Sequence, residues 1–71
     1  MDGMGGFPQK LKELRKSHKM SQRVLSELCG LSKNMIGQYE RGEKTPSMKS
    51  IVALADFFGV SVDSLVGRKN F

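Results

Sequence analysis

Residues 21–42, SQRVLSELCGLSKNMIGQYERG, constrain the fold of this chain more than any other stretch. Ser21 is suited to cap the start of one short helix, and Gly30 suits the left-handed position at which a helix ends. Ser32 is a candidate cap for a second helix, so only Gly30 and Leu31 would separate the two. A turn this short fixes the angle between its helices, and the segment therefore predicts a helix pair of set geometry.

Helix signals also flank this pair. Pro8 is tolerated in a first helical turn and places the start of a helix near Phe7. Ser47 and Ser61 are candidate caps for two later helices, the first of which stops at Gly59. Because the sequence shows neither the alternation of strands nor an internal repeat, we expect an all-α domain, a compact bundle of five short helices.

Apolar residues repeat at the spacing of a buried helix face. The third helix is expected to run from about Lys33 to Glu40, and Arg15 shares the inner face of the first. The predicted core consists of Phe7, Leu11, Leu14, Val24, Leu25, Leu28, Cys29, Ile36, Tyr39, Ile51, Leu54, Ala55, Phe58, Val62, Leu65 and Val66.

Length and charge narrow the class of protein. The 71 residues make one domain, expected at 7–67, with a glycine-rich lead at 1–6 and a tail at 68–71. The net charge of +5 favours an anionic partner, nucleic acid first. A single cysteine cannot form an internal disulfide, which suits the reducing cytoplasm. Neither a long apolar run nor a signal-peptide pattern is present, so neither membrane insertion nor secretion is expected.

The third helix presents side chains that can read DNA bases. If Ile36 and Tyr39 face the core, the outward stripe carries Lys33, Asn34, Gly37 and Gln38. Lysine can donate to guanine O6 and N7, and asparagine or glutamine can make a two-point contact with adenine. A helix-turn-helix places such a helix in the major groove. The alternative is that these side chains serve only solubility.

A second set of residues is suited to phosphate contacts, which position a protein on DNA without reading sequence. Gln22 opens the second helix, where free backbone amides attract an anion. Arg41, Lys44 and Thr45 lie in the loop after the third helix, and Arg23 lies at the edge. For each basic residue the alternative is a solvated surface charge.

Separate motifs in the chain resemble one known family. The runs LKELR, SQRVLSELCGLS, IGQYERG, PS and IVALADFFGVSVDSL, in this order and spacing, resemble the phage-repressor (Cro/CI, or xenobiotic-response-element) class of helix-turn-helix domain. The resemblance covers residues 7–67 and implies a lambda-repressor-like fold. It also implies base contacts by Lys33, Asn34 and Gln38, and a phosphate contact by the Gln22 amide.

The resemblance further implies a partly buried ion pair between Arg15 and Glu40, which would tie the first helix to the third. The alternative is two independent surface charges. The chain departs from the family pattern at Ser26, where alanine is usual, and at Gly37, where serine is frequent. Glycine at position 37 is expected to cost about 1 kcal/mol of helix stability relative to alanine.

An apolar patch is a candidate surface for self-association. Phe57 lies off the core stripe of the fourth helix, and Val62 and Val66 flank the last helix. Exposed together, these residues would suit a two-fold contact, weak without DNA, that sets two recognition helices about 34 Å apart. The alternative is that Val62 and Val66 complete the core while Phe57 covers its edge.

Catalytic and metal chemistry are not expected. His18 has no partner at ligand or nucleophile spacing, and Cys29 lies on an apolar stripe as a small core residue. No metal, cofactor or small-molecule ligand is indicated, and an enzyme is not expected.

We interpret the sequence as that of a cytoplasmic, sequence-specific DNA-binding transcriptional regulator. A repressor that binds double-stranded DNA as a homodimer is expected. The alternative is a protein-interaction module of the same fold, antitoxin-like or coactivator-type, in which the third helix holds a protein partner.

Overall fold

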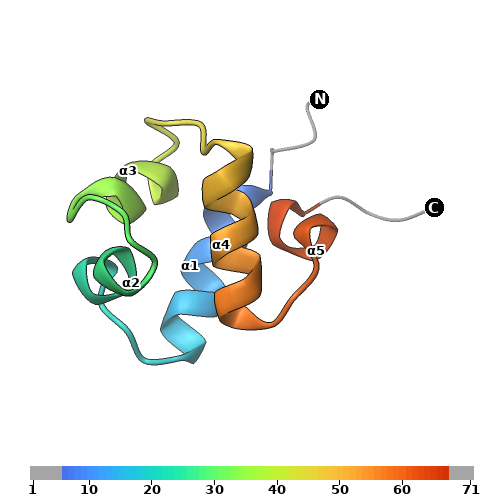
Figure 1. Cartoon of the computed structure of the whole chain (residues 1–71), viewed down its shortest axis with the longest axis horizontal. Helices are drawn as coiled ribbons and strands as arrows, with labels where there is room; N and C mark the ends of the chain where they lie inside the picture. Colours follow the sequence, from blue (N-terminus) through green and yellow to red (C-terminus); the bar gives the residue numbers. More distant parts are fainter. Residues whose placement is uncertain (1–5, 68–71) are drawn as a thin grey trace.

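The computed structural model describes residues 6–67, which form five helices and no strand. The helices are α1 (Phe7–Ser17), α2 (Gln22–Leu28), α3 (Met35–Glu40), α4 (Met48–Phe58) and α5 (Val62–Val66). α2 and α3 lie on one side of α4, and α5 lies on the other (Figure 1). The predicted all-α bundle of five helices is therefore confirmed. Most of the expected lead and all of the expected tail, residues 1–5 and 68–71, lie outside the described residues.

Three helices begin at the serines that the sequence identifies as caps. The hydroxyl oxygens of Ser21, Ser47 and Ser61 accept hydrogen bonds from backbone N–H groups three residues later, at 3.1, 3.1 and 3.0 Å. Each bond satisfies a donor that the first helical turn leaves without a partner. The left-handed conformation predicted for Gly30 is confirmed by its φ of +72°. The predicted end of α4 at Gly59 is confirmed too, and this glycine is also left-handed, with a φ of +69°.

One core joins all five helices. Phe7 and Leu11 of α1 are buried, and the Phe7 ring meets the edge of the Tyr39 ring of α3 at a centroid distance of 5.7 Å. The remaining buried apolar residues are Leu25, Ile36, Ile51, Leu54, Ala55, Phe58, Leu65 and Val66. No helix among residues 6–67 combines the length and the apolar character that crossing a bilayer requires.

The predicted buried face of α2 was partly wrong. Val24 and Leu28 are 43% and 58% exposed, while Leu25 and Ser26 are fully buried and Cys29 is half-buried. The reason is that Ser26 faces α3 and its hydroxyl accepts a hydrogen bond from the Ile36 N–H at 3.2 Å. The spacing of apolar residues cannot reveal a polar residue that is buried by a hydrogen bond. The predicted buried face of α2 was therefore rotated away from the actual one.

The start of α3 also differs from the prediction. The helix begins at Met35, so Lys33 and Asn34 lie in the turn before it. Ser32 is not a side-chain cap, since it is its backbone carbonyl that accepts from the Met35 N–H, at 3.0 Å. Asn34 occupies the cap position without a side-chain capping bond. The connection between the two helices is therefore longer than the predicted two residues.

The apolar patch predicted around α5 was wrong in one member. Val66 is only 5% exposed, because α5 packs against both α1 and α4 and turns Leu65 and Val66 into the core. Val62 is half-buried, and Phe57 is 39% exposed with its ring against that of Phe58.

Candidate nucleic-acid interface

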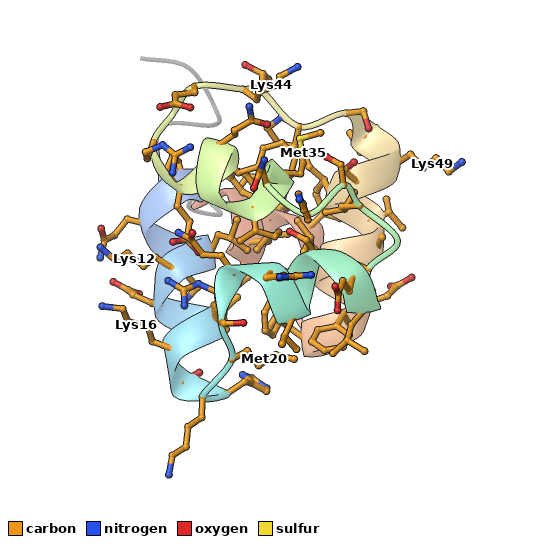
Figure 2. The ribbon with its side chains drawn as sticks, turned by 90° about the vertical axis from the view of Figure 1, so that its left-hand side faces the viewer. Lys12, Lys16, Met20, Met35, Lys44 and Lys49 are labelled. Atoms are coloured by element: carbon orange, nitrogen blue, oxygen red, sulfur yellow. The ribbon has the colours of Figure 1, made fainter. Side chains whose placement is uncertain are left out.

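The outer face of α2 and α3 carries the three side chains predicted to read bases. Lys33 and Asn34 are exposed in the turn that leads into α3, and Gln38 is half-exposed on the helix itself. Figure 2 looks onto this face, with α2 and α3 in front. Lys44 projects at its upper edge, and Lys12 and Lys16 of α1 project along one side (Figure 2).

Gly37 was predicted to lie on the outward stripe, but the structure covers it. A Cβ atom built on Gly37 would lie 2.9 Å from Gln22 Oε1 and 3.0 Å from Arg41 Nη1. The side chains of Gln22 and Arg41 therefore lie over the middle of α3, where a larger residue would otherwise be. Two of the residues predicted to contact phosphate thus meet at one point.

The structure brings Arg15 and Glu40 together in a nearly buried ion pair. Arg15 Nε donates to Glu40 Oε2 at 2.6 Å and Nη2 donates to Oε1 at 3.0 Å, while only 11% and 4% of the two side chains are exposed. Arg15 Nη1 donates to the Met20 carbonyl at 2.8 Å. The guanidinium thereby links α1 to α3 and to the connector before α2.

Glu40 also holds Gln22. The Gln22 amide nitrogen donates to Glu40 Oε1 at 3.0 Å, and since a carboxylate can only accept, this contact fixes the orientation of the amide. Burial alone raises the pKa of the Glu40 carboxyl, but the hydrogen bonds from Arg15 and Gln22 and the charges of Arg15 and Lys12 outweigh it. The net effect holds the pKa of Glu40 below its usual value, so the carboxylate stays ionised.

The basic residues around this face differ in how their charge is shared. Arg41 Nε and Nη2 donate to both oxygens of Glu43, at 2.8 and 3.2 Å, and this hydrogen bonding raises the pKa of Arg41 and lowers that of Glu43. Arg23 Nε lies 3.4 Å from Glu27 Oε2 in an exposed pair. No ion pair between residues 6–67 uses Lys44, which is exposed beside Thr45.

Comparison with known proteins shows the family to which this helical domain belongs. The helix-turn-helix family model matches residues 11–65, most of the chain. The chain belongs to the Cro/CI-type helix-turn-helix family. This is a family of DNA-binding regulators.

Among its relatives is the uncharacterised helix-turn-helix transcriptional regulator YobD of Bacillus subtilis, 41% identical over 61 residues that cover 86% of this chain and 54% of YobD. The immunity repressor of Bacillus phage phi105 is 33% identical over 61 residues, 86% of this chain and 42% of the repressor. The chain therefore spans about half the length of these curated relatives.

A solved structure matches the fold of this helix-turn-helix domain. The restriction-modification controller protein C.AhdI from Aeromonas hydrophila superposes with a TM-score of 0.78 at 34% identity, covering 87% of this chain and 94% of C.AhdI.

Sequence reasoning missed three contacts of this helix-turn-helix face. Ser26 supplies the bond to α3, and its only signal in the sequence was a hydroxyl at a position where alanine is usual. Glu43 neutralises part of Arg41, a pairing suggested only by the closeness of the two residues in one loop. The charge of Lys12 acts on Glu40. Lys12 precedes Arg15 by three residues, which places both on neighbouring parts of the α1 surface.

His18 and Cys29, the two residues considered for catalytic or metal chemistry, both pack within the helix-turn-helix fold. His18 Nδ1 lies 2.9 Å from the Leu14 carbonyl oxygen, and its ring meets the Phe58 ring at 5.0 Å. Cys29 is half-buried, which raises the pKa of its thiol. Residues 6–67 contain no group of three or more side chains arranged to hold a metal ion.

Proposed function

We propose that this chain is a sequence-specific DNA-binding transcriptional regulator that reads the major groove with α3 and the turn before it. One observation carries the proposal: in a helix-turn-helix, Lys33 and Asn34 are exposed in the turn before α3, and Gln38 is half-exposed on α3. Their donors and acceptors suit guanine and adenine edges. The likeness to a phage immunity repressor supports repression as the regulatory outcome.

The proposed phosphate contacts come from Gln22, Arg23, Arg41, Lys44 and Thr45. These residues border the reading face on the α2 side and on the loop after α3. Lys44 has no ion-pair partner among residues 6–67, Arg23 exchanges Glu27 for a phosphate oxygen on binding, and Arg41 stays bound to Glu43 and donates to phosphate through Nη1. Such contacts hold the domain in register on the duplex.

We further propose that two copies act together in the cytoplasm as a homodimer that is weak without DNA. A six-residue recognition helix makes few base contacts, and a second copy one DNA turn away doubles them. Phe57 and Val62 are the members of the predicted patch that keep exposed apolar surface, so we assign the contact to them without Val66. A palindromic site strengthens the contact because it holds both copies close together.

Selection from a pool of random duplexes, followed by titration at several salt concentrations, tests the function. A DNA-binding regulator enriches a consensus and binds it about 10³-fold or more tightly than scrambled duplex. An unenriched pool and no salt-dependent binding would contradict the proposal and favour the alternative, a module that holds a protein partner. Sedimentation of the protein alone and on a palindromic duplex tests the dimer, which a one-to-one complex at saturation would exclude.

A further inference from the structure

Gly37 differs from the glycines that end helices in this chain. Gly30, Gly42 and Gly59 have left-handed φ values, whereas Gly37 lies inside α3 and has no such conformation. The backbone at position 37 is therefore open to any residue, and alanine would favour the helix more than glycine does. The reason for the glycine lies in the side chains that cover it.

Those side chains come from both sides of the recognition helix. The nearest atoms to a Cβ on Gly37 would be Gln22 Oε1 at 2.9 Å, Arg41 Nη1 at 3.0 Å and Gln22 Cδ at 3.4 Å. Cβ atoms in proteins essentially never approach other atoms within 3.0 Å, so a side chain at position 37 would displace at least the Gln22 amide. Both obstructing groups are the ends of flexible side chains, so they would move while the fold remains.

Each of these two side chains also donates a hydrogen bond to a carboxylate. Gln22 is bound by Glu40, which is itself fixed by Arg15, and Arg41 is bound by Glu43 through Nε and Nη2. The Gln22 amide oxygen faces Gly37, while its nitrogen donates one proton to Glu40 and keeps a second proton for another acceptor. Arg41 Nη1 lies beside it over Gly37 and does not bond to Glu43. The absence of a side chain at position 37 thus leaves room for the Gln22 amide, with its oxygen toward Gly37, and the Arg41 guanidinium to lie close to each other.

We infer that Gly37 is a positioning residue for DNA binding, because its missing side chain lets Gln22 and Arg41 converge on one phosphate group. The inference rests on the proposed function and adds to it a residue that touches no DNA. A substitution at position 37 should therefore affect stability and DNA binding in opposite directions. A residue that stabilises α3 should lower the affinity for DNA.

The test is Gly37→Ala, measured in the intact chain by thermal unfolding, by DNA titration and by NMR of the Gln22 side-chain amide. The melting temperature should stay unchanged or rise by up to about 8 °C, the effect of a better helix former in a domain of this size. Affinity for cognate and scrambled duplexes should fall alike, by about tenfold, the loss expected when a hydrogen bond to a charged group is broken. The Gln22 amide signals should shift in the free protein, a change that helix stabilisation alone does not produce.

Combination with Gln22→Ala and Arg41→Ala shows whether Gly37 acts through those side chains. In that double variant, Gly37→Ala should cause no further loss of affinity. Gln9→Ala is the matched control, because it removes an exposed glutamine amide on α1 and should change neither affinity nor the Gln22 signals.

Two results would overturn the inference. One is a Gly37→Ala variant that binds DNA as the parent chain does, and the other is an equal loss of affinity when Gln22 and Arg41 are already absent. Failure of the proposed function looks different, since the parent chain itself would then bind no duplex. The Gln22 amide signals report on the positioning in either case.

Discussion

Replacement of Arg15 by alanine tests the central ion pair of the fold. The change removes both guanidinium hydrogen bonds to Glu40 and leaves that carboxylate, 4% exposed, with the Gln22 amide as its remaining donor. It also removes the donor to the Met20 carbonyl. Breaking one side of a buried pair costs about 3–5 kcal/mol, because the remaining charge is stranded.

Protonation of the Glu40 carboxylate limits the loss of stability in Arg15→Ala. A glutamate with an ordinary pKa near 4.3 can be neutralised at pH 7 for about 3.7 kcal/mol, since each pH unit corresponds to about 1.36 kcal/mol. We therefore expect Arg15→Ala to lower the free energy of unfolding by about 3–4 kcal/mol at pH 7. That is a large share of the roughly 5–15 kcal/mol typical of whole domains.

The loss of stability caused by Arg15→Ala should be smaller in acid than at pH 7. In the parent chain the pKa of Glu40 is lowered on folding, so its contribution is present above the unfolded pKa and is lost as pH falls through the folded pKa. In Arg15→Ala the stranded carboxyl takes up a proton more readily, so acid relieves the penalty. The difference between the two proteins should shrink by up to about 1.4 kcal/mol per pH unit between pH 7 and 5.

Urea unfolding monitored by circular dichroism at both pH values measures these differences. The double change with Glu40→Ala should cost less than the sum of the single changes, because it removes the stranded charge. Strict additivity, or a penalty of the same size at pH 7 and pH 5, would refute the reasoning.

Three further predictions concern single positions. Asn34→Ala and Gln38→Ala should each weaken binding to the cognate duplex by about 1–3 kcal/mol and leave scrambled duplex nearly unaffected, and equal losses in the two titrations would argue against base reading. Lys19 has a left-handed φ of +57° at the end of α1, so Lys19→Gly should stabilise the fold by about 0.5–1 kcal/mol in urea unfolding, and a loss would contradict the strain. Ser26→Ala should destabilise the fold by about 1–2 kcal/mol by removing the buried cap of α3, whereas the control Ser32→Ala should have little effect. If the two serine changes destabilised the fold equally, Ser32 would have to cap α3 as the sequence predicted.

Features of the fold that depend on neighbouring residues were predictable from the sequence. Ser21, Ser47 and Ser61 cap helices through bonds that span three residues, so their role is visible in the local sequence. The left-handed glycines follow from the same local chemistry. The apolar stripes of α1 and α4 were predictable because these helices have 11 residues each, enough for the periodicity to be resolved.

Features that depend on a contact between helices were not predictable. The face of α2 was misassigned because seven residues give a short pattern and Ser26 is buried by a bond to α3. Gly37 was placed on the open surface because spacing gives the direction of a residue on its helix but not what covers it. The sequence left Val66 open between the core and the apolar patch, and the contacts of α5 with α1 and α4 place it in the core.

The base-reading assignment for Lys33, Asn34 and Gln38 stays a prediction, and the structure adds to it only where those side chains lie. Their exposure could be predicted because Ile36 and Tyr39, which define the opposite side of α3, are strongly apolar. The network that links Gln22 to Arg15 through Glu40 required the assembled fold, because its members are 18 and 25 residues apart in sequence.

The hydroxyl of Ser26 has a consequence for how this domain opens. α3 has six residues, too few to persist alone in water, and an amide of its first turn is bound by a side chain of α2. Melting of α2 therefore releases α3 as well, and the two helices should exchange their amide hydrogens as one cooperative unit. In native-state hydrogen exchange, the Ile36 amide should follow the opening of α2, although ten residues separate it from Ser26.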